Sequence, residues 1–187
     1  AFCTPTRKLG GDAADFTYRQ AWIDGYSVYR VIGNTGTARF LNFTVQGPRP
    51  ETQPGTGWPS LHEPFGDVPE ANLFKQQLET AADGSFELYL GGEKRGANWL
   101  PTTPGTRKLF IRQGFDSWDE TPARLSIERM GMEAPPPLPT PARMREAMAW
   151  AGNFLTGMMR DWPDHPYQYS GGIVDPACLN QFPPERF

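Results

Sequence analysis

The chain has few of the side chains from which metal and catalytic sites are usually built. Among its 187 residues are only two histidines, His62 and His165, and two cysteines, Cys3 and Cys178. Two histidines are too few for a His-rich metal centre unless carboxylates complete it, and no Cys-x-x-Cys pair is present. With so few cysteines, we expect free thiols in a reducing compartment rather than a disulfide, which favours a cytoplasmic location.

Signatures of several enzyme and membrane classes are also missing. There is no Gly-x-Ser-x-Gly nucleophile elbow, no phosphate-binding loop and no dinucleotide fingerprint. No apolar run approaches the ~20 residues that span a bilayer, and the chain does not start with a signal peptide. The net charge is -3 and the basic residues are scattered, which argues against nucleic-acid binding. We therefore expect no cofactor, no bound metal, no nucleic-acid partner and no membrane span.

Glycine, proline and aromatic residues are abundant, and they indicate a fold of short strands and many turns. Glycine and proline each occur 20 times, and aromatics make up 13% of the chain. The clearest strand is 38–46, where Leu41, Phe43 and Val45 alternate with polar residues. Its other face, which includes Asn42 of an Asn-Phe-Thr sequon, is expected to face solvent. Further strands are predicted at 17–23, 26–32, 73–80, 85–90, 107–113 and 123–130, with a hairpin turn at Asp24-Gly25. This spacing predicts an antiparallel β-sandwich or jelly roll over residues 1–133.

Prolines interrupt the strand pattern in two places. Residues 47–69 hold six prolines and predict a long loop. Residues 134–141 form a Pro-rich linker, and Thr140 near its end is a good N-cap for the helix that follows. Apolar residues then recur every three or four positions, predicting a long amphipathic helix that packs on the sandwich within 134–163, before an irregular tail at 164–187. Alternatively, the Met144–Met158 face of this helix docks on a second copy, making a homo-oligomer, or on a missing second β segment.

Two groups of polar residues are candidates for acid–base chemistry. Clustered carboxylates can bind a cation or share a proton, but a solvated turn explains the acidic motif FDSWDET as well. A histidine beside an acid can act as a general base, although a solvent-exposed loop histidine is the simpler interpretation. In the hypothesis that the protein is a hydrolase or lyase, these groups serve as acid and base. They are Asp116, Asp119 and Glu120 in the turn and His62, Glu63 and Asp67 in the long loop.

Aromatic residues near the strand ends support a different hypothesis, the binding of a small organic ligand that is lipid-like or carbohydrate-like. Rings at loop tips either line such a site or pack in corners, as Trp99 would beside a turn held by Asn98. Arg112, on the same strand face as Phe110, would hold a carboxylate or sulfate. The residues assigned to the site in this hypothesis are Trp58, Asn98, Trp99, Arg112, Trp118 and Asp119, with Phe115 as a further ring.

Two long blocks resemble a bacterial family, the domain of unknown function 1214. They are GGDAADFTYRQAWIDGYSVYRVIGNTGTARFLNFTV and DGSFELYLGGEKRGANWLPTTPGTRKLFIRQGFDSWDETPARLSIER. The family motif of Asn-Trp-Leu-Pro, a strand bearing Arg, an aromatic-Trp-Asp turn and a following strand matches 98–101, Arg112, 115–119 and 123–129 in order. The resemblance implies a jelly-roll sandwich with added helices and a chain of partial length. It carries no established activity, so it transfers no catalytic residue.

Overall fold

A computed structural model describes residues 15–48, 67–132 and 138–161 of the chain. These residues fall into two compact units, which are described separately. The first unit contains all the strands, and the second contains the helix. Several predicted features lie outside the described residues: Cys3, Cys178, Trp58, His62, Glu63 and the tail at 164–187.

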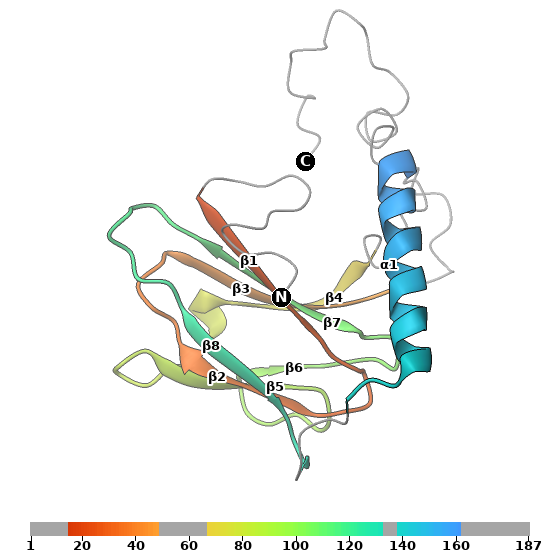
Figure 1. Cartoon of the computed structure of the whole chain (residues 1–187). Coiled ribbons are helices and arrows are strands. Elements are labelled where there is room, and N and C mark those ends of the chain that lie inside the picture. The colour runs from red at the N-terminus through yellow and green to blue at the C-terminus, as the bar shows by residue number, and fades with distance from the viewer. Residues whose placement is uncertain (1–14, 49–66, 133–137, 162–187) are drawn as a thin grey trace, which may run out of the picture. The chain divides into compact units, whose positions relative to one another are not determined.

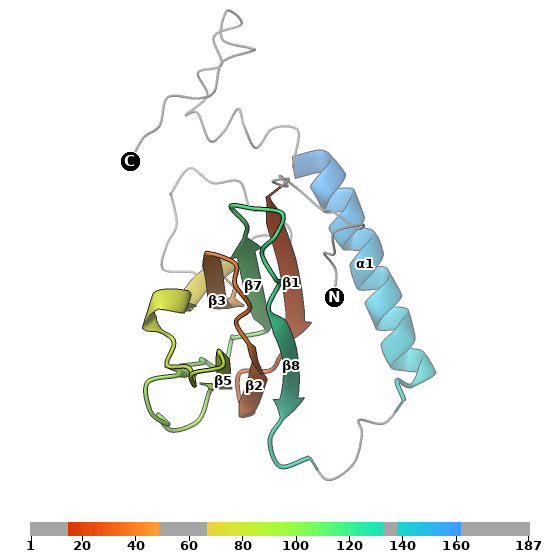
Figure 2. The same cartoon turned by 90° about the vertical axis from the view of Figure 1, so that its left-hand side faces the viewer.

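The first unit is mainly β and has two sheets of four strands, seen as two layers in Figures 1 and 2. One sheet is antiparallel throughout and has the order β1 (Phe16–Trp22), β7 (Lys108–Gly114), β3 (Phe40–Gly47), β4 (Val68–Phe74). The other has the order β6 (Trp99–Leu100), β5 (Ser85–Leu90), β2 (Tyr29–Asn34), β8 (Arg124–Arg129).

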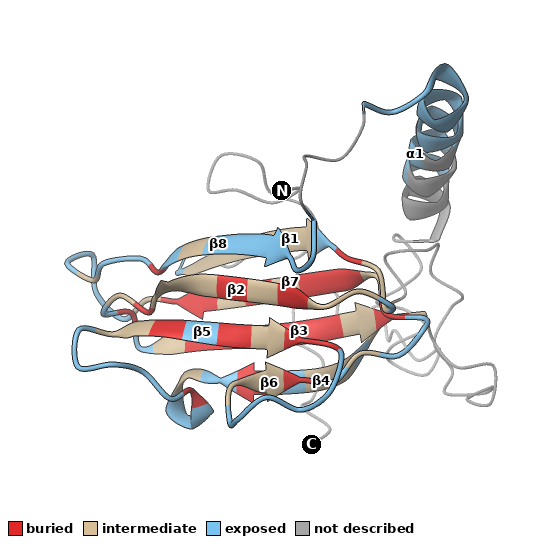
Figure 3. Cartoon of the chain, turned by 90° about the horizontal axis from the view of Figure 1, so that it is seen from below, coloured by how far each residue is buried: buried red, intermediate tan, exposed pale blue. Residues whose placement is uncertain are grey.

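The two sheets share one hydrophobic core. Alternate residues of β3 and β5 are buried there, as the sequence pattern predicts, and Phe43 meets Phe86 edge-on with ring centroids 5.7 Å apart. The buried segments of β2, β3, β5 and β7 are visible as red bands in Figure 3, whereas β8 is largely exposed. At the β1 and β8 edges, the Arg19 guanidinium donates to the Ala123 carbonyl at 3.0 Å, which ties the two layers together.

The predicted hairpin at Asp24-Gly25 is wrong. β1 pairs with β7, and β2 pairs with β5 and β8, so this turn carries the chain from one sheet to the other. The Asp24 carboxylate accepts hydrogen bonds from the backbone N–H of Tyr26 and from the N–H and hydroxyl of Ser27. An aspartate side chain that accepts from the backbone N–H groups of the turn stabilises an Asx turn. Such a turn is not specific to a two-residue hairpin.

Two further strand predictions need correction. The strand expected at 73–80 ends at Phe74 and is followed by a short 3-10 helix, Lys75–Gln77, while β4 starts as early as Val68. Pro69 is tolerated because β4 is an edge strand with a register shift opposite Val45 and Gln46. The two-residue strand β6 was not predicted, and because it pairs with β5 in parallel, the second sheet is not purely antiparallel.

The second unit contains α1 (Pro141–Asp161). Thr140 caps it: its hydroxyl accepts from the backbone N–H of Arg143 at 3.3 Å, and its carbonyl accepts from Met144 N–H at 2.9 Å. Apolar residues of its stripe are exposed in the described part of the helix, among them Met148 at 70% and Leu155 at 59%. That the helix packs on the sandwich stays a prediction.

Candidate functional site

The sequence predicts that the polar face of β3 is exposed to solvent, but in the structure this face is buried at Asn42 and Thr44. Asn42 and Thr44 point away from the core, yet both side chains are fully buried. Polar groups buried without hydrogen bonds are costly, so such positions are usually either fully bonded or functional. This unexpected burial marks the outer face of the β1-β7-β3-β4 sheet as the candidate site.

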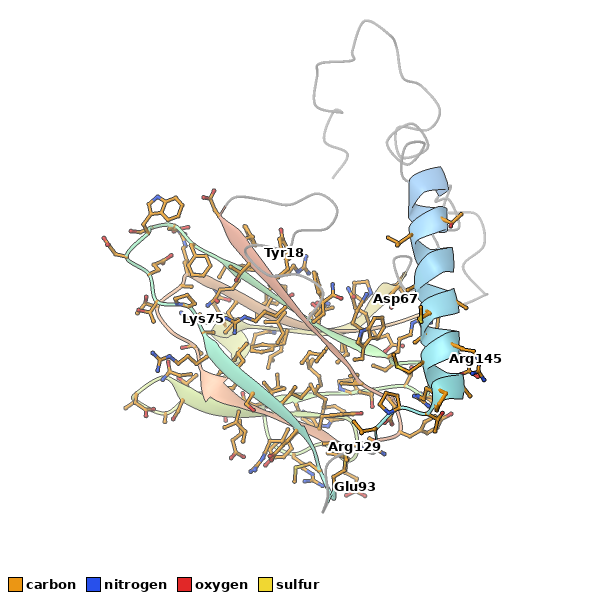
Figure 4. The ribbon with its side chains drawn as sticks, in the orientation of Figure 1. Tyr18, Asp67, Lys75, Glu93, Arg129 and Arg145 are labelled. Carbon is orange, nitrogen blue, oxygen red and sulfur yellow. The ribbon has the colours of Figure 1, made fainter. Side chains whose placement is uncertain are left out.

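Strand register places a polar centre in the middle of this face. Arg112 of β7 lies between Tyr18 of β1 and Asn42 of β3, and Asn42 in turn lies beside Phe74 of β4. Figure 4 shows Tyr18 on the side of its sheet that faces away from the second sheet. We call the whole set the Arg112 patch; it comprises the polar residues Asn42, Thr44, Asn72 and Arg112 and the rings of Phe16, Tyr18, Phe40, Phe74 and Phe110.

The five rings form a continuous arc around the polar centre. Tyr18 stacks on Phe110 at 5.9 Å with an interplanar angle of 9°, and on Phe16 at 6.0 Å. From Phe16 the arc continues through Phe40 at 5.7 Å to Phe74 at 6.2 Å. Gly114 makes this course possible, because a Cβ there would lie 2.8 Å from the Phe16 ring.

Within the arc, the hydrogen bonds leave two buried donors without acceptors. Arg112 Nη2 donates to Asn42 Oδ1 at 3.2 Å, and the Thr44 hydroxyl lies 2.7 Å from both Asn42 Oδ1 and Asn72 Oδ1. In the part of the chain that the structure describes, Asn42 Nδ2 and Arg112 Nε have no partner. Leaving a buried donor unsatisfied costs about 1–3 kcal/mol, so the patch is either strained or designed to receive an acceptor.

Among the described residues, the charge of Arg112 is also uncompensated. Arg112 forms no ion pair with any described residue and lies with its guanidinium 5.7 Å from the centre of the Phe110 ring. The strand positions paired directly with Arg112, which are Tyr18 of β1 and Asn42 of β3, carry no carboxylate. A half-buried cation without a counter-charge favours a site that accepts an anion.

Asn98 and Trp99, two residues predicted to bind a ligand, hydrogen-bond to the backbone of loops that adjoin the other sheet. The Asn98 amide donates to the Glu79 carbonyl at 2.7 Å and accepts from the Glu79 N–H at 2.8 Å. The Trp99 indole N–H donates to the Gly91 carbonyl at 3.0 Å. These contacts match the architectural role predicted for Asn98, and they place both residues on a different sheet from Arg112.

The acidic turn after β7 is held by its own hydrogen bonds. Asp116 pairs with Arg39 at 2.7 Å, and the Glu120 carboxylate accepts from the N–H of Asp116. Trp118 is 98% exposed, and Asp119 contributes only its N–H, to Ser117. The turn adjoins the start of β3 at Arg39, whereas Val68, which follows Asp67, pairs with Gly47 at its far end. Among the described residues, no three His, Cys, Asp or Glu side chains gather to hold a metal.

Sequence reasoning selected Arg112, with Phe110 on the same strand face, and missed the rest of the patch. The available signal was a period-two pattern of aromatic and polar residues on strand faces that were assumed to be solvated, as in Phe16-x-Tyr18 and Phe110-x-Arg112. This pattern indicates a site only when strand pairing brings β1, β7, β3 and β4 together.

Within residues 15–48, 67–132 and 138–161, the structure has no helix that is long and apolar enough to cross a membrane.

Comparison with known proteins gives structural similarity without an assigned activity. No protein-family model matches the chain, and no curated protein matches it. An uncharacterized protein from Burkholderia cenocepacia, known from its crystal structure, is 31% identical over 90% of this chain, with a TM-score of 0.70. The chain spans 42% of that protein's length. The VPA0106 protein from Vibrio parahaemolyticus aligns with 62% of this chain and 31% of its own, at 14% identity and a TM-score of 0.41.

Proposed function

We propose that this protein binds a small organic ligand on the outer face of the β1-β7-β3-β4 sheet. The observation that carries the proposal is the pair of a half-buried Arg112 and a fully buried Asn42, which is incompletely hydrogen-bonded inside an arc of five rings. Binding sites for small molecules commonly combine aromatic walls with a few polar groups that fix orientation. The rings would contact the apolar body of the ligand, and Arg112 would contact its polar group.

The experiment is native mass spectrometry of the protein purified from its source without added ligand. We expect a co-purifying small mass in the wild-type protein and its loss in Arg112→Ala. Arg30→Ala is the matched control, because Arg30 lies on the other sheet and pairs with Glu87 and Glu128. Retention of the bound mass in Arg112→Ala, or its absence from folded wild-type protein, would count against the proposal.

A second candidate, a subunit of a homo-oligomer, is favoured by the exposed apolar residues of α1. Met148 and Leu155 present apolar side chains to solvent in the described chain. Patches of this kind often mark interfaces. Light scattering coupled to size exclusion tests this candidate: we expect a multimer that Met148→Glu dissociates, and a wild-type monomer would refute it.

We further propose that the chain belongs with the domain of unknown function 1214 proteins and that its sandwich is of the jelly-roll type. The order of the matching blocks supports this: Asn98-Trp99, Arg112, Trp118-Asp119 and the β8 segment. Asn98 and Trp99 hydrogen-bond to the backbone carbonyls of Glu79 and Gly91, a structural role that would account for a motif shared without a shared activity.

A further inference from the structure

Two free donors in the Arg112 patch lie on paired residues of neighbouring strands. Arg112 and Asn42 are direct cross-strand partners in β7 and β3, so their side chains leave the same face of the sheet side by side. Asn42 Oδ1 is already occupied, because it accepts from Arg112 Nη2 and lies within hydrogen-bond distance of the Thr44 hydroxyl. The other amide atom, Asn42 Nδ2, is a buried donor without a partner among the described residues, as is Arg112 Nε.

The number and charge of these donors limit the ligand group that would fit. Two N–H groups match the two oxygens of one carboxylate, and the single positive charge of Arg112 matches its single negative charge. A neutral amide would bring an NH₂ group toward donors that need acceptors. A phosphate dianion would bring more charge and more acceptor oxygens than the described patch can match.

Resting on the proposed function, we infer that the ligand is a monocarboxylate with an apolar body. One carboxylate oxygen accepts from Arg112 Nε and the other from Asn42 Nδ2, while the body lies against the arc of rings. Thr44 is a positioning residue, because its hydroxyl contacts Asn42 Oδ1 and Asn72 Oδ1 at 2.7 Å and has no free donor of its own to offer the ligand.

The test compares two probes of equal shape, 4-phenylbutanoate and its neutral primary amide, 4-phenylbutanamide, titrated into the ¹⁵N-labelled full chain. We expect the carboxylate to bind at least about tenfold more tightly than the amide and to shift the Arg112 Nε–H and Asn42 Nδ2–H₂ resonances. Asn42→Asp puts a competing carboxylate beside Arg112 and should weaken 4-phenylbutanoate binding by a similar factor. Arg30→Gln, on the other sheet, should leave it unchanged.

The possible negative results distinguish the carboxylate inference from the proposed binding function. Equal binding of the two probes at the patch overturns the carboxylate inference and leaves the proposed binding function standing. Tighter binding of inorganic phosphate than of 4-phenylbutanoate would also overturn it. If neither probe shifts the Arg112 or Asn42 resonances and no mass co-purifies, the binding function itself fails.

Two further variants test the positioning role of Thr44 and guard against a folding defect. Thr44→Ser retains the hydroxyl and should retain the preference for the carboxylate. Thr44→Val removes the hydroxyl at nearly equal volume and should reduce that preference while binding of 4-phenylbutanamide stays the same. If Asn42→Asp does not fold, Arg112→Lys replaces it, because a lysine keeps the charge and lacks Nε; undiminished 4-phenylbutanoate binding in that variant would contradict the inference.

Discussion

Asp24 is the described carboxylate with the largest set of hydrogen-bond donors. The Ser27 hydroxyl and the Tyr29 hydroxyl both donate to it, and Arg129 lies 3.5 Å away. These contacts, the Ser27 hydroxyl first, hold the pKa of Asp24 below its ordinary value, although partial burial acts in the opposite direction. Because the carboxylate is the favoured form in the fold, Asp24 should link stability to pH.

The first prediction concerns Asp24→Asn. A carboxyl group whose pKa is lower in the folded than in the unfolded chain stabilises the fold above its unfolded pKa of about 3.9, and this contribution disappears as the pH falls through the folded value. We expect the variant to be less stable than wild type at pH 6, with the gap closing as the pH drops below about 4. Urea unfolding at a series of pH values measures the difference in unfolding free energy between the variant and wild type. A difference that does not change with pH would contradict the coupling of Asp24 ionisation to stability. Asp119→Asn is the control.

Gly25 is required by a close approach of the backbone. A Cβ at this position would lie 1.7 Å from the Thr103 carbonyl oxygen, and the Gly25 carbonyl itself accepts from the Thr102 hydroxyl at 3.1 Å. The turn between β1 and β2 therefore packs directly on the loop before β7.

We predict that Gly25→Ala destabilises the protein by about 1–3 kcal/mol, since backbone must move to admit the methyl group. For a chain of this size the melting temperature should fall by about 2–4 °C for each kcal/mol. Gly152→Ala is the control, because it lies at a helical position with nothing within 4 Å of the added atom. It should leave the melting temperature unchanged or raise it slightly. Equal melting temperatures for the two variants would show that the Thr103 contact is relaxed in solution.

At the scale of elements, one carboxylate ties β4 to the loop that precedes β7. Glu70 lies where the β3–β4 register shifts, and it accepts from the hydroxyls of Thr103, at 2.8 Å, and Thr106. Thr106 is almost fully buried and also accepts from the Thr103 N–H. The irregularity in β4 is therefore held in place by a polar network.

Thr106→Val should cost about 1–3 kcal/mol, because the Glu70 carboxylate and the Thr103 N–H both lose a buried partner. Thr106→Ser should recover most of this loss. Chemical denaturation gives the free energies, and amide exchange should show the opening concentrated in β4. Uniformly faster exchange across both sheets in Thr106→Val would mean that the network does not act locally.

At the scale of the whole molecule, the two sheets depend on the same core. Leu88 of the second sheet is fully buried in the cluster that also contains Phe43 and Leu109 of the first. Neither sheet can bury its apolar face without the other, so the described strands should unfold together.

We predict that Leu88→Ala costs about 2–5 kcal/mol and accelerates hydrogen exchange to a similar extent in β3 and β7 as in β2 and β5. Ile127→Ala, at a 36% exposed position on β8, should cost less than half as much. Protection that survives in the first sheet of Leu88→Ala would separate the sheets into independent folding units.

The sequence predicted what depends on local pattern. Alternation in β3 and β5 identified the residues that face the core, and Thr140 identified the start of α1. Partner choice depends on the whole chain, so the Asp24-Gly25 hairpin was wrong. Arg112 and Phe110 were selected from the sequence, but the rest of the Arg112 patch was missed for the same reason: Asn42 looks like an ordinary solvated residue until β7 and β4 flank it.

The pairing of β1 has a consequence for synthesis on the ribosome. Of the described strands, β1 is synthesised first and pairs with β7 alone, so its aromatic residues, among them Phe16 and Tyr18, emerge long before the partner strand exists. The second sheet waits longer still, since β8 completes it. Pairings this distant in sequence fold slowly, and unpaired strands of this kind are prone to wrong association. The nascent chain therefore presents its most aromatic strand to chaperones and to neighbouring nascent chains before Gly114 can pair with Phe16.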